Sequence, residues 1–184
     1  MDRLPFEDLV YFGDSARVPY GVKSVATIED FTRQIAEFLL KRDVKALIIA
    51  CNTMAAVAAD VVRRVAGDVP VLDVIDAGAR AAVAATQSQG IAVIATPTTI
   101  NSNAYARAMH QLNPDVRVYS QACPLFVPLV EEGWLDHPVT LLTAQEYLKS
   151  VLVEEVDTLV LGCTHYPLIK PLLQQVAGDK MNIV

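Results

Sequence analysis

Two cysteines of this chain of 184 residues occupy similar sequence contexts. Cys51 lies in LIIACNT (47–53) and Cys163 lies in LVLGCTH (159–165). A free thiol has a pKa of about 8.5, which a helix N-terminus or a nearby cation can lower toward the pH at which acid–base catalysis works best. If the two thiols face each other across a cleft, one removes a proton from one face of a carbon. The other thiol then delivers a proton to the opposite face.

Other interpretations of these cysteines stay open at this point. A cysteine at the end of a buried strand is often only a small core residue, and Cys123, to which no motif gives a chemical role, is interpreted in this way. The spacing of Cys163 and His165 is too tight for a usual zinc site, and no CxxC motif is present. A nucleophilic cysteine with His165 as its base is the third option. Residues two apart at a strand end point to opposite faces, so this pairing requires the turn to rotate one of them.

The elements that position the cysteines alternate between short apolar runs and helical segments. We expect strands over residues 9–13, 46–50, 71–75, 91–95, 116–119 and 158–161. We expect helices over residues 28–41, 53–65, 77–88, 100–111, 125–132, 143–153 and 166–176. Thr27 is the expected N-cap of the first helix, with Asp30 in its first turn, and Pro167 opens the last helix. Apolar strands that alternate with helices predict an α/β fold with mainly parallel sheets flanked by helices, and ligands then bind at the carboxyl ends of the strands.

The order of the elements indicates an internal duplication. VYFGDS (10–15) leads to the first cysteine motif, and VYSQAC (118–123) leads to the second. We therefore expect two similar domains, 1–75 and 76–184, related by pseudo-twofold symmetry around a shared active-site cleft. The second half has an additional strand–helix unit (91–105) with no counterpart in the first half, so we expect the first domain to be incomplete. The final residues, MNIV, resemble the start of a strand that leads back to the first domain.

The composition narrows the class of protein. A net charge of −6 with 20% charged residues argues against electrostatic binding to the phosphate backbone of a nucleic acid. Three cysteines do not form a disulfide framework and fit a reducing compartment. The first residues lack the basic and apolar regions of a signal peptide, and no uncharged apolar run reaches the roughly 18 residues of a membrane span. We expect a soluble, cytoplasmic protein.

Four segments resemble glutamate racemase, within the aspartate/glutamate racemase superfamily. They are, in order, GDSARVPYG (13–21), IACNTMAAVA (49–58), ACPLFVPLVEEG (122–133) and LGCTHYPLI (161–169). The resemblance covers nearly the whole chain and implies interconversion of L- and D-glutamate without a cofactor or metal, supplying D-glutamate for peptidoglycan. The CNT and GCTHYPLI motifs together favour this group over aspartate and hydantoin racemases, which remain an alternative. A catalytically incomplete fragment that acts only as a binding protein is the other alternative.

The resemblance also implies roles for individual residues. Cys51 exchanges the α-proton on the D-glutamate face, Cys163 does so on the L-glutamate face, and His165 supports Cys163. The implied substrate-binding residues are Tyr20, Gly21, Asn52, Thr53, Thr96, Thr99, Glu131 and Thr164. The resemblance does not decide which threonine of the TPTT turn, Thr98 included, contacts substrate. Glu131 can equally be a solvated helix end.

This chain departs from the family pattern at both ends. The family begins with a strand and an Asp-Ser-Gly loop whose aspartate supports the first cysteine, and Asp14-Ser15 is not a replacement for it. The family also continues beyond MNIV. The resemblance therefore implies a chain trimmed at both ends, in which Cys51 lacks its expected helper. Glutamate is the expected partner, a homodimer is the candidate assembly, and neither a membrane nor nucleic acid is expected.

Overall fold

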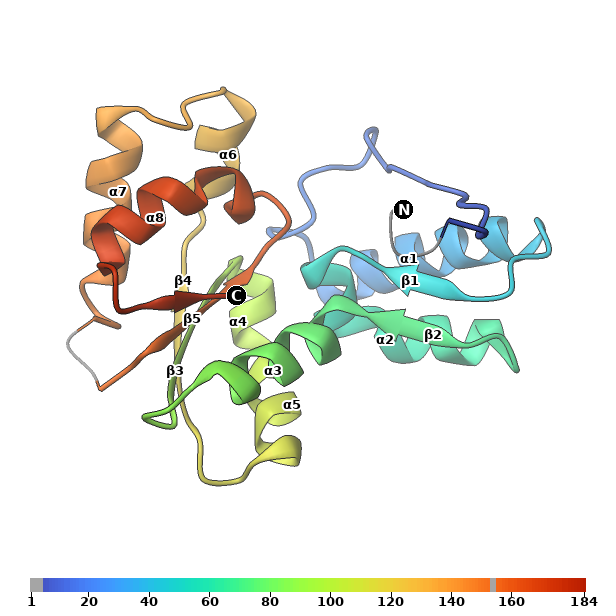
Figure 1. Ribbon diagram of the computed structural model, residues 1–184. Coiled ribbons are helices and arrows are strands. Elements are labelled where there is room, and N and C mark those ends of the chain that lie inside the picture. Colours follow the sequence, from blue (N-terminus) through green and yellow to red (C-terminus); the bar gives the residue numbers. More distant parts are fainter. Residues whose placement is uncertain (1–4, 153–154) are drawn as a thin grey trace.

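The computed structural model describes residues 5–152 and 155–184. Its first half contains one small parallel sheet and two long helices (Figure 1). The elements are α1 (Val25–Leu40), β1 (Leu47–Ile49), α2 (Asn52–Ala66) and β2 (Val71–Asp73). The two helices pack on each other, and Leu47 and Ile49 point into the core that α2 shares with this sheet.

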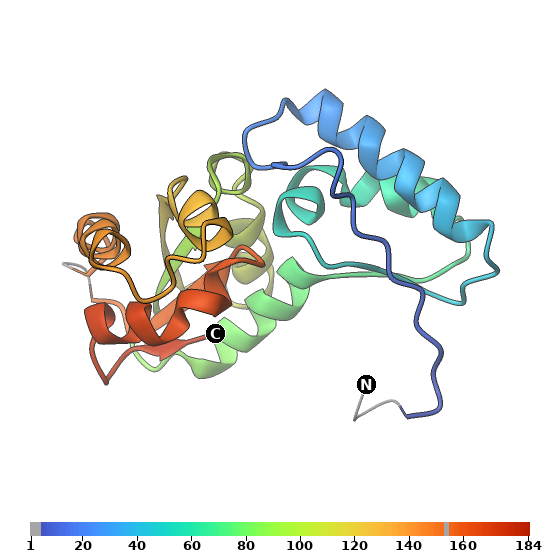
Figure 2. The ribbon, with the colours of Figure 1, turned by 90° about the horizontal axis from the view of Figure 1, so that it is seen from above.

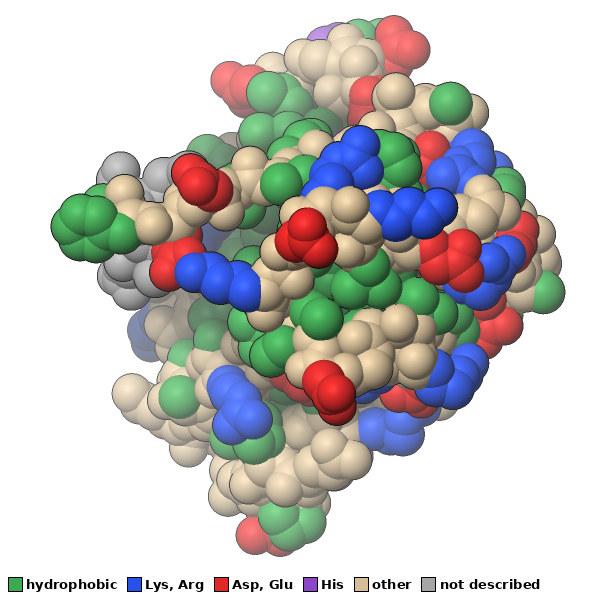
Figure 3. Space-filling view, turned by 90° about the vertical axis from the view of Figure 1, so that its right-hand side faces the viewer, with side chains coloured by type: hydrophobic (Ala, Val, Ile, Leu, Met, Phe, Trp, Pro, Cys, Tyr) green, Lys and Arg blue, Asp and Glu red, His purple; other side chains and the backbone are tan. Residues whose placement is uncertain are grey.

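The other face of the two-stranded sheet is bare in the described part of the chain. Ile48 of β1 pairs with Leu72 of β2, and their side chains are 63% and 60% exposed. Figure 3 views this end of the molecule and shows hydrophobic side chains at the surface between charged ones. A strand pair with one covered face follows from the alternation of side chains along a strand.

The second half contains a four-stranded sheet in the order β4-β3-β5-β6, with every pairing parallel. Its elements are α3 (Val74–Ala85), β3 (Gly90–Ala95), α4 (Pro97–Asn101), α5 (Ala104–Leu112), β4 (Arg117–Ala122), α6 (Phe126–Glu131), α7 (Pro138–Leu148), β5 (Thr158–Gly162), the 3-10 turn η1 (Tyr166–Ile169), α8 (Lys170–Ala177) and β6 (Asn182–Ile183). Figure 2 shows the two halves side by side, joined between β2 and α3.

Both faces of the four-stranded sheet are covered, as the near-continuous apolar strands predicted. Ile91 and Val93 of β3 pack in one core with α3 and α5. Ala92 and Ile94 pack in a second core with α6, α7 and α8. Every residue of β3 is buried. The prediction of an α/β fold with parallel sheets flanked by helices is confirmed. None of the described helices is both long and apolar enough to cross a membrane.

The predicted strand over residues 9–13 is wrong. This segment has no regular structure, and Leu9 and Tyr11 are 65% and 83% exposed. An apolar run becomes a strand only where a neighbouring edge accepts its hydrogen bonds, and none of the described strands pairs with it.

The start of the first helix also differs from its prediction. Ser24 caps α1, because its hydroxyl accepts the backbone N–H of Thr27 at 3.2 Å. Thr27 therefore lies inside the helix, and Asp30 lies beyond the first turn. Two serine- or threonine-type caps three residues apart are hard to separate by sequence.

Two predicted helices are divided. The segment 100–111 forms α4 and α5, separated at Asn103, whose φ of 55° lies in the left-handed region. The segment 166–176 starts as the 3-10 turn η1 and continues as α8.

Other element boundaries shift by a few residues. The segment 71–75 ends as a strand at Asp73, whose carboxylate caps α3. As a result α3 starts three residues before the predicted 77–88. The helix predicted over 143–153 starts earlier, at Pro138, and the predicted end at residue 153 lies outside the described residues.

Candidate active site

Cys51 and Cys163 each lie directly after the carboxyl end of a strand. Cys51 follows β1 and is the N-cap residue of α2, whereas Cys163 follows β5 and precedes η1. Each cysteine strand pairs in parallel with the next strand along the chain, β1 with β2 and β5 with β6. Cys51 is half-buried and Cys163 is buried. Both thiols thus occupy the strand edge where ligands of parallel sheets bind.

Burial favours the neutral thiol form of both cysteines. Burial raises the pKa of Cys163 to about 11, although the backbone N–H of His165 opposes the rise; a negative charge on Cys51 adds to it. Burial also raises the pKa of Cys51, against the opposing effect of the Met54 and Thr53 backbone N–H groups. The helix N-termini therefore favour the thiolates without outweighing the loss of solvation.

His165 and Glu131 form a relay behind Cys163. The Nδ1 of His165 lies 3.8 Å from the Cys163 Sγ, and its Nε2 lies 2.5 Å from the Glu131 Oε1. His165 has α-type backbone angles (φ −79°, ψ −32°), so the turn after β5 rotates it toward the cysteine two residues earlier. Glu131, at the end of α6, holds the imidazole although its own side chain is 67% exposed. Such an arrangement can accept a proton from the thiol.

Thr164 lies beside this relay. It lines a cavity of about 270 Å³ together with Val130, Glu131, His165 and Leu168. Its side chain is exposed, unlike that of the adjacent Cys163. The segment 163–165 therefore points a thiol inward and a hydroxyl outward from one turn.

Three threonine hydroxyls from both halves meet in a buried cluster. Thr53, in the first turn of α2, lies 3.0 Å from the Thr96 hydroxyl and 3.4 Å from that of Thr99. Thr96 and Thr99 are themselves 3.0 Å apart. Thr98 points elsewhere and donates to the carbonyl of Gly21 at 2.9 Å. The structure thus separates the threonines of the TPTT turn into two groups.

Gly21 is packed so closely that it cannot carry a side chain without displacing its neighbour. A Cβ at this position would lie 2.7 Å from the Thr96 Cβ. Tyr20 is buried beside it, and its hydroxyl donates to the Asp14 carboxylate. The Pro-Tyr-Gly segment is therefore more than a surface turn, because it packs against the β3–α4 loop.

The Asn52 side chain accepts a hydrogen bond from Tyr105, a residue that lies in none of the sequence motifs. The Tyr105 hydroxyl donates to the Asn52 Oδ1 at 2.7 Å, and both residues are buried. Tyr105 lies in an ordinary amphipathic helix with no motif, so the local sequence carries no signal for this contact. Only the packing of α5 against the start of α2 reveals it.

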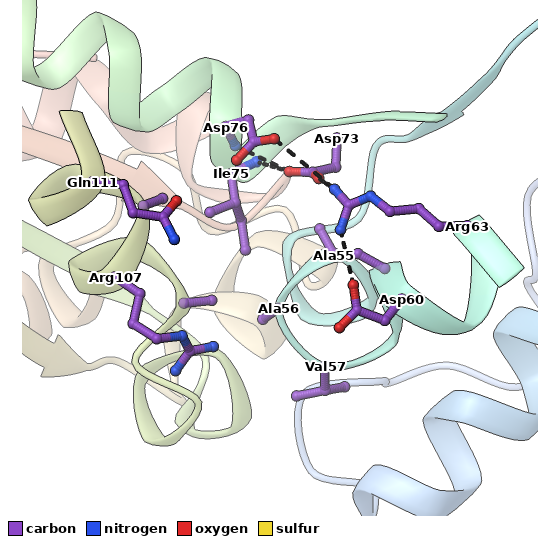
Figure 4. Close-up of a pocket in the computed structure, with 13 residues that line it drawn as sticks. Ala55, Ala56, Val57, Asp60, Arg63, Asp73, Ile75, Asp76, Arg107 and Gln111 are labelled. Atoms are coloured by element: carbon purple, nitrogen blue, oxygen red, sulfur yellow. Dashed lines mark hydrogen bonds and ion pairs between the residues drawn. The ribbon is translucent and has the colours of Figure 1, made fainter. Parts of the chain in front are cut away.

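A second cavity of about 270 Å³ lies away from both cysteines. It is formed by α2, the start of α3 and α5 (Figure 4). Arg63 enters into ion pairs there with Asp73 at 2.8 Å, Asp60 at 3.1 Å and Asp76 at 3.9 Å. These pairs connect α2 to the junction between the halves. Among the described residues, no group of three His, Cys, Asp or Glu side chains is arranged to hold a metal ion.

Comparisons with known proteins agree with this geometry. The family described as Asp/Glu/Hydantoin racemase matches residues 3–182. A glutamate racemase of Syntrophus aciditrophicus is 69% identical over 184 residues, covering 100% of this chain and 68% of that protein. A glutamate racemase of Neisseria meningitidis is 63% identical over 179 residues, covering 97% of this chain and 66% of that protein. The chain thus spans about two thirds of the length of these relatives.

Solved structures give the same result. The crystal structure of glutamate racemase from Francisella tularensis in complex with D-glutamate has a TM-score of 0.93 and 47% identity. The match covers 100% of this chain and 68% of the Francisella tularensis chain. The glutamate racemase isoform RacE1 from Bacillus anthracis has a TM-score of 0.95 and 39% identity, with 68% of its length covered by 100% of this chain.

Proposed function

Because this chain belongs to the Asp/Glu/hydantoin racemase family, and within it to the glutamate racemases, we propose that it interconverts L- and D-glutamate by proton transfer between two cysteines. The observation that carries the proposal is the position of the two thiols, each directly after the carboxyl end of a parallel strand. The relative from Francisella tularensis, solved with D-glutamate, supports glutamate as the substrate. The product D-glutamate would serve peptidoglycan synthesis.

In the L-to-D direction, Cys163 acts as the base. His165 first accepts the thiol proton, because its Nδ1 faces the Sγ and Glu131 stabilises the imidazolium. The thiolate removes the α-proton of L-glutamate, and the electron pair of the broken C–H bond delocalises into the α-carboxylate. Cys51, a neutral thiol at this pH, delivers its proton to the opposite face of the carbon. Cys163 ends as a thiol, His165 as an imidazolium and Cys51 as a thiolate. His165 then releases its proton to solvent and Cys51 takes up a proton, which restores the starting state.

The α-proton of glutamate is much less acidic than a thiol, so the carbanion must be stabilised by hydrogen-bond donors. Asn52 and Thr53, in the first turn of α2, offer an amide and a hydroxyl next to Cys51. Thr164 offers an exposed hydroxyl next to Cys163. Donors at a helix start suit a carboxylate, and their effect is greatest where water is excluded. Tyr20, Gly21, Thr96 and Thr99 complete the proposed substrate-binding set.

The two halves supply the two walls of this proposed site. We assign them as similar domains, residues 1–75 and 76–184, related by a pseudo-twofold axis, with the substrate between them. The threonine cluster supports this arrangement, because Thr53 comes from the first half and Thr96 and Thr99 come from the second. Closure of the halves over the substrate would bring both thiols to the α-carbon.

Exchange of the α-proton with solvent tests the proposal directly. L-glutamate and D-glutamate are incubated with the chain in D₂O, and the loss of the α-proton signal is followed by ¹H NMR while circular dichroism follows racemisation. We expect exchange of both isomers with glutamate, and little with aspartate or 5-substituted hydantoins. Preferred exchange of aspartate or a hydantoin would reassign the substrate, and no exchange of any substrate would overturn the racemase activity of this chain.

One observation favours a second function, glutamate binding without turnover. Among the described residues, no imidazole or carboxylate hydrogen-bonds to the Cys51 thiol, and this side chain makes no capping hydrogen bond at the start of α2. A base without a partner to lower its pKa turns over slowly. Saturable glutamate binding by calorimetry, together with undetectable exchange, would identify this second function.

A further inference from the structure

Tyr105 contacts the residues next to both cysteines. Its hydroxyl donates to the Oδ1 of Asn52, which directly follows Cys51. Its ring lies against Gly162, which directly precedes Cys163: a Cβ added to Gly162 would be 3.1 Å from the Tyr105 Cε2. One side chain on α5 therefore touches the carboxyl end of β5 and the start of α2.

The tyrosine ring is held in place from two sides. Gly78 of α3 faces the other edge of the ring, and a Cβ there would lie 3.1 Å from both the Tyr105 Cε1 and its hydroxyl oxygen. The side chain is 5% exposed. Because the ring fits between two glycines, it cannot swing away from Asn52 without moving α3 or β5.

The hydrogen bond determines which way the Asn52 amide points. The carbonyl oxygen turns toward Tyr105, so the NH₂ group points away from it. The amide nitrogen donates to no described residue, and it is not among the buried polar atoms that lack a partner, so it retains contact with solvent. Burial, with the nearby charges of Asp73 and Cys163, raises the pKa of Tyr105 well above its usual value. The hydroxyl therefore remains a donor at any working pH.

We propose that Tyr105 is a positioning residue that holds the Asn52 amide with its NH₂ group toward the substrate, so that the α-carboxylate is bound beside the two thiols. This inference rests on the proposed racemase function. Without the tyrosine hydroxyl, the amide can rotate and present its oxygen to the carboxylate, which repels it. The contact also spans the two halves, so it sets the Asn52 amide relative to Cys163.

A double-mutant cycle tests this role. Tyr105→Phe removes only the hydroxyl and leaves the ring between its glycines, and Asn52→Ala removes the amide. We expect Tyr105→Phe to weaken glutamate binding about tenfold, the size of one lost hydrogen bond. In the Asn52→Ala background the same change is expected to have no further effect. Equal losses in both backgrounds would overturn the proposal, because Tyr105 would then act independently of Asn52.

Tyr147→Phe is the matched control. Tyr147 lies on α7, its ring packs on Phe126 with centroids 5.3 Å apart, and its hydroxyl accepts the backbone N–H of Leu125 at 3.3 Å. This variant also loses one hydroxyl, and we expect unchanged glutamate binding. If it weakens binding as much as Tyr105→Phe does, the effect is general destabilisation and the proposal fails.

A measurement without substrate separates this inference from the proposed function. The side-chain amide signals of Asn52, assigned by their loss in Asn52→Ala, report the hydrogen bond in ¹H–¹⁵N NMR spectra. We expect them to shift in Tyr105→Phe and to stay in place in Tyr147→Phe. Absence of glutamate binding by the unmodified chain would refute the proposed function, whereas unmoved Asn52 signals would refute the role of Tyr105.

Discussion

The two cysteine sites have the same backbone frame but different chemical surroundings. Cys163 is buried and has an imidazole 3.8 Å from its sulfur, itself held by a carboxylate. Cys51 is half-buried, and its side chain makes no capping hydrogen bond at the start of α2. The residues that flank Cys51 are instead supported by the other half, through Thr96, Thr99 and Tyr105. The similar sequence contexts of the two cysteines thus place both thiols at strand ends, but they do not give both thiols a side chain that can accept a proton.

The sheet that carries Cys163 is also more completely covered than the sheet that carries Cys51. β5 lies inside a four-stranded sheet with helices on both faces. β1 lies in a two-stranded sheet, one face of which residues 5–152 and 155–184 leave bare. A covered sheet excludes water and holds its strand ends rigidly, and both properties strengthen electrostatic interactions at the site. We therefore expect the Cys163 side to be the more effective of the two.

The largest expected effect comes from removing either thiol. Cys51→Ser and Cys163→Ser should each lower racemisation on the order of 10³-fold, because a serine hydroxyl does not transfer the proton at neutral pH. Solvent exchange should survive only for the isomer that faces the remaining cysteine, L-glutamate in Cys51→Ser and D-glutamate in Cys163→Ser. ¹H NMR in D₂O measures both rates, and we expect the first to be faster. Full racemisation by either variant would contradict a two-base mechanism.

Core substitutions test the difference between the two sheets. Ile94, fully buried in β3, should lose about 3 kcal/mol of unfolding free energy when changed to Ala, because a cavity remains. Ile48→Ala in β1 is the matched control and should change stability by less than about 0.5 kcal/mol, since its side chain is 63% exposed. Urea unfolding measures both. A comparable loss at Ile48 would mean that the bare face is covered in solution.

The raised thiol pKa values predict a rising pH profile. The pKa of Cys163 is about 11, so below that pH the thiolate is the minor form and its fraction grows about tenfold per pH unit. In Cys51→Ser combined with His165→Gln, where no imidazole accepts the thiol proton, exchange of L-glutamate should therefore rise about a hundredfold between pH 7 and pH 9, and with His165 present it should rise less. Exchange rates at constant ionic strength check this slope. A flat profile would show that substrate binding, rather than bulk pH, sets the charge of the thiol.

The smallest expected effect concerns the relay. His165→Gln should slow L-glutamate exchange about tenfold or more, because the Cys163 proton loses its charged acceptor. D-glutamate exchange should fall less, since Cys51 starts that direction. His137→Gln is the matched control, a histidine that stacks on Trp134 and caps α7. Equal slowing of both isomers by His165→Gln would place the imidazole in a structural role instead.

Much of the fold followed from local patterns. The strands near residues 46–50, 91–95 and 158–161 were predicted from their sequence pattern. A short run of apolar residues with small or polar residues on either side usually forms a buried strand in a compact protein. The segment 9–13 has the same pattern and forms no strand, because strand formation depends on a partner edge elsewhere in the chain. The break at Asn103 was missed, since a single left-handed residue barely changes the apolar periodicity.

The sequence by itself determined that two thiols lie at the ends of parallel strands. A short apolar run that is followed by a small residue and the start of a helix predicts a buried strand that ends just before the cysteine. Only the tertiary structure decided which partners each thiol has. The contact of Glu131 with His165 spans 34 residues, and that of Tyr105 with Asn52 spans 53. Contacts between residues so far apart in the sequence depend on how whole elements pack, and no local spacing of residues predicts them. The asymmetry between the two cysteines is therefore a property of the packed molecule.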